Sequence, residues 1–276
     1  MMIPRIAQFP SELAARAQLA RLGGTRVPAV LVHPNWERPA PTVIWMHGRT
    51  ANKELDPGRY LRWMRAGIAA VSLDLPGHGE RSDEILQSPD RSMQVLAQMR
   101  AEINGVVAAL AQPEYQGIFD PSRLAIGGMS LGGMAALRRL CDPHPFVAAA
   151  VECTCGWLKG LYFPPPDQAH LPRWRGPHDS EEVRKNDPSE HLGLWRPIPL
   201  LVLHNRGDEI VPLLSQLHFV ELLKDHYVLR GADVGLIRTE IFERTGAVQE
   251  HSGFGRLSNE AKNLQTEFLR GVLKPE

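Results

Sequence analysis

Residues 128–132 read Gly-Met-Ser-Leu-Gly and match the G-x-S-x-G pattern of nucleophilic serines. In that pattern the serine occupies a tight turn between a strand and a helix, and the glycines let neighbouring backbone approach closely. The helix that follows points its N-terminus at the site, where developing negative charge is favoured. The residues before the motif, Arg123–Gly128, have a strand pattern, and Leu131–Leu140 after it have a helical one. We therefore predict that Ser130 is a catalytic nucleophile.

A nucleophilic serine needs a base, and the base needs a carboxylate that orients it. For this kind of turn the expected chain order is serine, acid, histidine, each just after a strand. Asp208 lies in a turn after the apolar segment Ile198–His204, and His251 lies between the last predicted strand and the last helix. We predict Asp208 as the acid and His251 as the base.

Other residues compete for these two roles. Glu152 ends the predicted strand Phe146–Glu152, which comes before the strand that leads to Asp208, and Glu209 is the neighbour of Asp208, so both remain alternative acids. The chain has 11 histidines, most of which are expected to be surface or core residues. His226 follows a helix and not a strand, which makes it a poor candidate for the base.

The negative oxygen that forms during acyl transfer needs two backbone donors. One is expected to be the amide of Leu131, directly after the nucleophile. The second is expected in the segment Met46–Thr50, where His-Gly ends an early strand and glycine allows a sharp turn. We predict the Arg49 amide as this donor, with the Thr50 amide as the alternative. An ordinary turn at the end of a strand is the competing interpretation.

Strand and helix patterns alternate along the chain. Strands are predicted at Val27–His33, Thr42–Met46, Ile68–Asp74, Arg123–Gly128, Phe146–Glu152, Ile198–His204 and Val234–Phe242. Helices are predicted at Arg59–Arg65, Ser92–Ala111 and Leu131–Leu140, through Leu213, Leu217 and Val220, and through Leu257, Ala261, Leu264 and Phe268. This alternation predicts an α/β fold whose mostly parallel sheet is covered by helices on both faces.

Residues 153–197 interrupt this alternation, because they contain three consecutive prolines and little periodicity. A connection of this length is typically a lid or a binding loop. We predict a lid inserted into a single domain that spans residues 1–276. The substrate pocket is predicted to include aromatic side chains of this segment, although simple core packing explains them equally well: Trp157, Tyr162, Phe163 and Trp174. Cys153 and Cys155 lack a second Cys or His pair at zinc spacing, so no metal site is expected.

Composition excludes several classes of function. Lys plus Arg and Asp plus Glu each total 31, so the formal net charge is zero, whereas nucleic-acid binding requires a basic surface. Three cysteines are too few, and odd in number, for a disulfide framework. We find neither a signal sequence nor an apolar run of membrane-spanning length. The sequence therefore favours a cytoplasmic protein without nucleic-acid or membrane partners, and a homodimer stays open.

The order of these motifs resembles that of the α/β-hydrolases. The matching segments run from about Val27 to the C-terminus and are His47-Gly48, Asp74-Leu75-Pro76-Gly77-His78-Gly79, Gly128-x-Ser130-x-Gly132, Gly207-Asp208-x-x-Val211-Pro212 and His251. The segment Asn186–Leu192, which leads into Ile198–Leu201, is similar to the segment before the acid in the dienelactone-hydrolase and prolyl-oligopeptidase-like branch of bacterial esterases. Dienelactone hydrolases use a cysteine nucleophile, so the serine here implies ester chemistry. The resemblance implies no cofactor.

These observations predict a serine carboxylesterase that acts on small to medium acyl groups. A peptidase or amidase that uses the same residues is the first alternative, because sequence does not separate the leaving groups. A non-catalytic binding protein with the same fold is the second alternative. A complete set of serine, histidine and acid argues against it.

Overall fold

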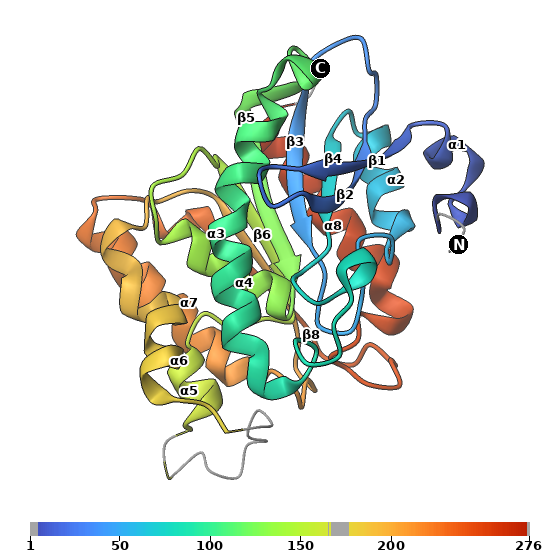
Figure 1. The fold of residues 1–276 in the computed structure, drawn as a ribbon. Coiled ribbons are helices and arrows are strands. Elements are labelled where there is room, and N and C mark those ends of the chain that lie inside the picture. Colours follow the sequence, from blue (N-terminus) through green and yellow to red (C-terminus); the bar gives the residue numbers. More distant parts are fainter. Residues whose placement is uncertain (1–4, 165, 167–176, 275–276) are drawn as a thin grey trace.

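The computed structural model describes residues 5–164, 166 and 177–274, and its centre is a sheet of eight strands in the order β1-β2-β4-β3-β5-β6-β7-β8 (Figure 1). The strands are β1 Ala17–Leu22, β2 Val27–Val32, β3 Ala40–Met46, β4 Ala69–Leu73, β5 Phe119–Met129, β6 Ala148–Glu152, β7 Leu200–Asn205 and β8 Ile237–Phe242. Strand β2 pairs antiparallel with β1 and β4. Along the rest of the sheet, in the order β4-β3-β5-β6-β7-β8, each strand is parallel to the next. The predicted α/β fold class is confirmed.

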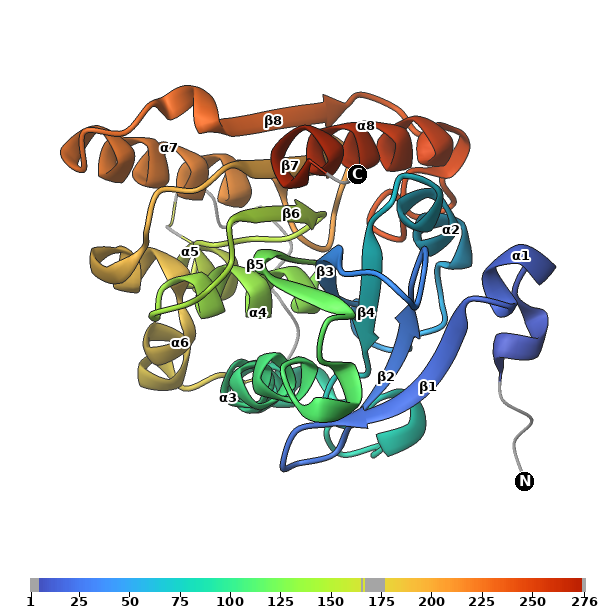
Figure 2. The same cartoon turned by 90° about the horizontal axis from the view of Figure 1, so that it is seen from above.

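Helices cover both faces of the sheet (Figure 2). Helices α3 Ser92–Leu110, α4 Leu131–Leu140 and α7 Leu213–Leu229 pack on one face, and α2 Pro57–Arg65 and α8 Ser258–Leu273 pack on the other. Strand β7 illustrates the division, because Leu200 and Val202 join the core under α3, α4 and α7, whereas Leu201 joins the core under α8. A buried parallel sheet needs apolar side chains on both faces, which explains the continuous apolar runs in the sequence.

The structure differs from the sequence prediction at several elements. Strand β1 was not predicted, and β5 begins at Phe119, four residues before the predicted Arg123. Residues Val234–Leu236 form a 3-10 helix and not the start of a strand, because the side chain of Asp233 accepts a hydrogen bond from the amide of Gly235. The short helix α1 covers Ser11–Ala14.

The described part of the interrupting segment is more regular than predicted. It contains helix α5 Leu158–Tyr162, helix α6 Ser180–Asn186 and a 3-10 helix over Pro188–Leu194. Buried apolar residues, among them Leu158 and Val183, attach these helices to the core. Function of the segment as a lid stays a prediction.

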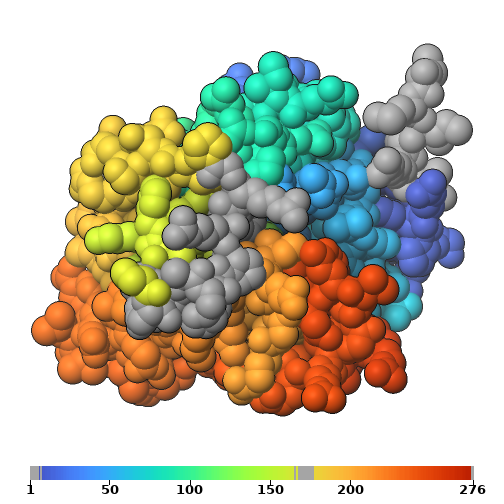
Figure 3. Space-filling model, turned by 90° about the horizontal axis from the view of Figure 1, so that it is seen from below, coloured from blue at the N-terminus to red at the C-terminus, as the bar shows by residue number. Residues whose placement is uncertain are grey.

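The parallel strands end at one edge of the sheet, which is the lower edge in Figure 1. Viewed from below, segments near residues 50, 90, 160, 210 and 250 form a single face (Figure 3). In an α/β sheet, the loops that follow the carboxyl ends of the strands are the usual place for a binding site. The predicted catalytic residues all belong to such loops.

Candidate active site

Ser130 lies on a strained turn between β5 and α4. Its φ is +52° and its ψ is −122°, a conformation that costs energy for any residue with a side chain. Hydrogen bonds hold it there: its amide donates to the carbonyl of Glu152 over 2.9 Å, and its carbonyl accepts from the Thr154 hydroxyl over 2.7 Å. The strain is thus balanced by neighbouring strands, as the nucleophile turn requires.

The two glycines of the motif allow the backbone of β3 to approach this turn. A Cβ atom on Gly128 would lie 2.6 Å from the carbonyl oxygen of Met46, and one on Gly132 would lie 2.4 Å from the same atom. Such distances are below any real carbon–oxygen contact. Glycine at these positions therefore brings the loop after β3 next to Ser130.

The structure brings the three predicted catalytic side chains together. The Oγ atom of Ser130 is 2.8 Å from Nε2 of His251, and Nδ1 of His251 is 2.8 Å from Oδ2 of Asp208. All three residues are buried. This chain of hydrogen bonds allows His251 to remove the serine proton while Asp208 fixes the orientation of the imidazole.

Backbone and side-chain contacts fix the acid and the base. Oδ1 of Asp208 accepts hydrogen bonds from the amides of Ile210 at 2.9 Å and Val211 at 2.8 Å. The side-chain nitrogen Nδ2 of Asn205, at the end of β7, donates to the carbonyl of Gly253 over 2.8 Å and also to the carbonyl of Glu250. The loop that carries His251 is thus tied to the strand that precedes Asp208.

The competing acids and the competing base lie elsewhere. The carboxylate of Glu152 pairs with the buried guanidinium of Arg59. Glu209 is exposed. His226 lies on α7, where its Nε2 atom bonds to the carbonyl of Trp195 over 2.8 Å. Within the described residues, no side chain of the three is hydrogen-bonded to Ser130 or His251, and Glu152 meets Ser130 only through its backbone carbonyl.

His47 orients the loop that was predicted to supply an oxyanion donor. Its Nε2 accepts from the amide of Leu75 over 3.1 Å, so its Nδ1 carries the proton and donates to the carbonyl of Gly48 over 2.7 Å. Burial lowers the pKa of His47 to about 4, so the ring is neutral at pH 7. Because C=O and N–H of a trans peptide point in opposite directions, the amide of Arg49 points away from His47.

The other predicted oxyanion donor, the amide of Leu131, is the first amide of helix α4. Leu131 begins α4, and the first amides of an α-helix have no partner within the helix. Thr50, the alternative to Arg49, has a φ of +62° and its hydroxyl donates to the carbonyl of Arg49 over 2.7 Å. Both Arg49 and Thr50 line the cavity next to Ser130.

A buried ion cluster supports the same loop. Nζ of Lys53 is 3.1 Å from Oδ2 of Asp74 and 2.6 Å from Oε1 of Glu80, and the amide of Lys53 donates to Oδ1 of Asp74 over 2.9 Å. Nδ1 of His78 bonds to the carbonyl of Pro76 over 2.8 Å. The turn that contains Asp74 and His78 is therefore held by side-chain hydrogen bonds and supports the active-site loops.

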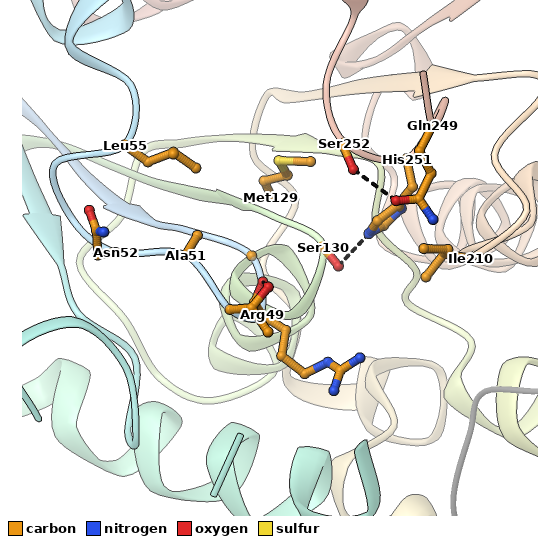
Figure 4. Close-up of a pocket in the computed structure, with 12 residues that line it drawn as sticks. Arg49, Ala51, Asn52, Leu55, Met129, Ser130, Ile210, Gln249, His251 and Ser252 are labelled. Atoms are coloured by element: carbon orange, nitrogen blue, oxygen red, sulfur yellow. Dashed lines mark hydrogen bonds between the residues drawn. The ribbon is translucent and has the colours of Figure 1, made fainter. Parts of the chain in front are cut away.

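A cavity of about 670 Å³ opens beside the nucleophile (Figure 4). Its walls come from the loop after β3, from the turn before α4 and from the loops that carry Asp208 and His251. The described lining residues are Gly48, Arg49, Thr50, Ala51, Asn52, Leu55, Met129, Ser130, Ile210, Gln249, His251 and Ser252. Sequence reasoning missed the walls formed by Asn52, Leu55 and Gln249, because no motif marks them.

The predicted aromatic pocket residues are not among these described lining residues, and their part in a substrate pocket stays a prediction. Trp157 packs on His218 with ring centroids 4.0 Å apart, and Tyr162 is buried 4.4 Å from the ring of His178. Phe163 lines a second cavity of about 380 Å³ between α5 and α6. Tyr162 belongs to the apolar core and Trp157 packs against it, whereas Phe163 is exposed. Trp174 lies outside the described residues.

The cysteines and the acidic residues do not form a metal site in the described part of the chain. Cys153 and Cys155 are buried free thiols whose pKa values are raised by burial. No group of three or more His, Cys, Asp or Glu side chains gathers as metal ligands would, within the described residues. Among the same residues, no helix combines the length and apolarity that crossing a membrane requires.

Comparison with known proteins identifies the family. The model of the prolyl oligopeptidase family matches residues 59–274, which is most of the chain. The chain belongs to the prolyl oligopeptidase family. This membership confirms the resemblance to the prolyl-oligopeptidase-like branch of α/β-hydrolases and makes the protein a serine hydrolase.

Similar sequences and structures have both esterase and peptidase names. Esterase YjfP of Escherichia coli is 26% identical over 211 residues, which cover 72% of this chain and 82% of the relative. The structure of TT1662 from Thermus thermophilus superposes with a TM-score of 0.69 at 22% identity, covering 95% of this chain and all of that chain. Acylaminoacyl peptidase of Pyrococcus horikoshii gives a TM-score of 0.70 at 19% identity. There the match covers 95% of this chain and 42% of the peptidase.

Proposed function

We propose that this member of the prolyl oligopeptidase family hydrolyses carboxylic esters of small to medium acyl groups through an acyl-enzyme. The observation that carries the proposal is the pair of 2.8 Å contacts that link Ser130 to His251 and His251 to Asp208. The esterase name of the Escherichia coli relative supports the ester as the substrate.

In the first step, Oγ of Ser130 attacks the acyl carbon while Nε2 of His251 takes the serine proton. The carbonyl oxygen becomes negative and is bound by the amides of Arg49 and Leu131. His251 then gives the proton to the alkoxide oxygen, the bond between this oxygen and the acyl carbon breaks, and the alcohol leaves. Asp208 stabilises the positive charge on His251 throughout.

In the second step, His251 takes a proton from water, whose oxygen attacks the acyl carbon of the acyl-enzyme. The proton returns to Oγ of Ser130 as the carboxylic acid is released. No cofactor or metal enters either step of this proposal.

Covalent labelling tests the nucleophile. Wild-type protein treated with a fluorophosphonate is expected to gain the mass of one adduct, and Ser130→Ala is expected to gain none. A folded wild-type protein that forms no adduct would contradict the proposal and favour the non-catalytic binding protein.

Substrate comparison tests the ester assignment. We expect kcat/KM for p-nitrophenyl acetate and p-nitrophenyl octanoate to exceed that for an aminoacyl p-nitroanilide. The reverse order would favour the peptidase or amidase alternative, which is supported by the family and by the fold shared with acylaminoacyl peptidase.

Two further parts of the proposal concern the whole molecule. We place the protein in the cytoplasm, because its three cysteines are free thiols, which persist in a reducing compartment. Cell fractionation tests this location. Light scattering on the purified protein distinguishes a monomer from a homodimer.

A further inference from the structure

The cavity beside Ser130 extends in a defined direction from the nucleophile. In Figure 4, Met129, Ser252 and Leu55 lie on one side of the site, whereas the side chain of Arg49 extends away from them. His251, Gln249 and Ser252 line the same cavity as Ser130. The atom of His251 that bonds to Ser130 is Nε2, so the proton donor of the proposed reaction faces this cavity.

The position of the proton donor decides which half of an ester enters the cavity. In the proposed reaction, His251 hands its proton to the leaving oxygen, which must therefore lie within hydrogen-bond reach of Nε2. The carbonyl oxygen is held separately by backbone amides of Arg49 and Leu131. Resting on the proposed function, we infer that this cavity binds the alcohol part of the ester and that Leu55 selects alcohols by size and apolarity.

The cavity walls indicate the chemical class of the alcohol. Ala51, Leu55, Met129 and Ile210 contribute apolar surface. Thr50, Asn52, Gln249 and Ser252 are polar but uncharged, and no carboxylate lines the cavity among the described residues. Arg49 also lines the cavity, but its guanidinium donates to the carbonyl of Gln87 over 3.1 Å. A volume of about 670 Å³ lies within the range that holds drug-sized groups. The walls therefore suit a bulky, uncharged alcohol such as a benzyl or larger aryl alcohol.

Leu55 is the most exposed apolar residue of these walls. Its relative exposure is 61%, so an apolar alcohol placed against it would remove substantial apolar surface from water. Its position is fixed locally: its amide donates to the carbonyl of Asn52 over 3.2 Å, and the amide of Glu54 donates to Oδ1 of Asn52 over 3.1 Å. The turn holds Leu55 at the rim of the cavity.

The ion cluster at Lys53 fixes this turn from the interior. The side chain of Lys53 is fully buried, between the cavity residues Asn52 and Leu55 in sequence, and pairs with Asp74 and Glu80. The hydroxyls of Tyr60 and Ser72 also donate to its carbonyl, over 3.0 and 2.8 Å. This part of the cavity wall is therefore already ordered before the alcohol binds, so little free energy is spent on ordering the loop.

Two series of esters separate the alcohol side from the acyl side. Ethyl and benzyl butyrate differ only in the alcohol, whereas p-nitrophenyl acetate and octanoate differ only in the acyl group. For Leu55→Ser we expect the benzyl-to-ethyl ratio of kcat/KM to fall about threefold to tenfold. The octanoate-to-acetate ratio is expected to stay within twofold of wild type.

Hydrolysis of the acyl-enzyme gives an independent readout. The butyryl-enzyme contains no alcohol, so its rate of hydrolysis, followed by mass after rapid mixing, is expected to be the same in Leu55→Ser and wild type. Leu229→Ser is the matched control, because Leu229 is the last residue of α7, is 84% exposed and does not line the cavity. It is expected to leave both ratios unchanged.

Three results would overturn the inference. A changed octanoate-to-acetate ratio together with slower or faster hydrolysis of the butyryl-enzyme would assign the cavity to the acyl group. Unchanged ratios in both series would show that Leu55 does not contact the substrate. Absence of hydrolysis of every ester by the wild type would instead refute the proposed function itself, and the inference with it.

Discussion

Arg59 of α2 and Glu152 at the end of β6 form a buried ion pair that is joined to the nucleophile through the backbone. Two nitrogens of the guanidinium donate to the two carboxylate oxygens, at 2.5 and 2.8 Å, and the carbonyl of Glu152 accepts the amide hydrogen of Ser130. The guanidinium also lies 4.3 Å from the ring centroid of Trp45. Glu152, an alternative acid by sequence, thus positions the turn of Ser130.

Removal of Glu152 from this pair is expected to lower the stability of the folded protein. Glu152→Ala removes one of the two carboxylates that pair with the buried guanidinium of Arg59 and leaves it Asp56 and Gln265. We expect a loss of about 3 kcal/mol in the free energy of unfolding, the low end of the range for a broken buried pair. Urea titration measures it. The control is Glu243→Ala, which breaks an exposed pair with Arg206 and is expected to leave the unfolding midpoint close to wild type. Equal midpoints for both variants would show that the buried pair is not required.

Separate substitutions of Asp208 and Glu209 test which of the two carboxylates acts as the acid of the triad. Asp208→Asn retains the size of the side chain but favours the wrong tautomer of His251, so we expect kcat to fall about 10³- to 10⁴-fold, as in other serine hydrolases with this triad. Glu209→Gln alters an exposed neighbour and is expected to retain wild-type kcat. Steady-state kinetics with p-nitrophenyl acetate measure both, and a large loss in Glu209→Gln alone would reassign the acid.

The buried imidazole of His47 predicts a dependence of stability on acid. Its pKa is lowered from 6.5 to about 4 by burial, so the unfolded chain binds a proton at higher pH than the folded chain does. Neutral His47 therefore contributes about 3 kcal/mol to the free energy of unfolding. This contribution is complete above pH 6.5 and is lost as the pH falls through about 4.

His47→Asn is expected to flatten this dependence. Urea titrations at pH 7 and pH 4.5 are expected to show a smaller difference in the variant than in the wild type. The free energy of unfolding of the variant is still expected to fall somewhat between pH 7 and pH 4.5, because burial also lowers the pKa of His33 and His78. The same change in the free energy of unfolding between pH 7 and pH 4.5 in both proteins would mean that His47 is not held neutral by the fold.

Two glycine substitutions are expected to have opposite effects. An added Cβ on Gly132 would lie 2.4 Å from the carbonyl oxygens of both Met46 and His47, so Gly132→Ala must push the loop after β3 away from α4 and lower both stability and activity. Gly271 lies within α8, and a Cβ there would meet no atom within 4 Å. Gly271→Ala is expected to raise stability by about 0.5–1 kcal/mol. Thermal unfolding and ester turnover distinguish them.

The site was predictable because a parallel sheet converts strand ends into neighbours. Ser130, Asp208 and His251 each follow a strand, and the fold brings those three loops to one edge. Sequence order was therefore sufficient to predict that these three side chains meet. Strand β1 was missed for the opposite reason: its residues, Ala17–Leu22, suit a helix as well as a strand, and pairing with β2 makes it a strand.

The cavity walls could not be predicted from local sequence. Aromatic residues such as Trp157 and Tyr162 suggested a pocket, but the same rings satisfy the core when helices α5 and α6 fold against it. Leu55 and Gln249 have no distinguishing neighbours in the sequence, and only the packing of two distant loops places them around one cavity. Contacts of this kind arise from tertiary structure.

The strand order also has a consequence for biosynthesis. From β5 to β8 each new strand adds beside the previous one, so a chain that emerges from the ribosome can extend the sheet in the order in which it is made. Ser130, however, is made 121 residues before His251, the base it needs. On the proposed mechanism, Ser130 gains its base only after His251 has been made, so a chain that ends before residue 251 is expected to have no nucleophilic serine.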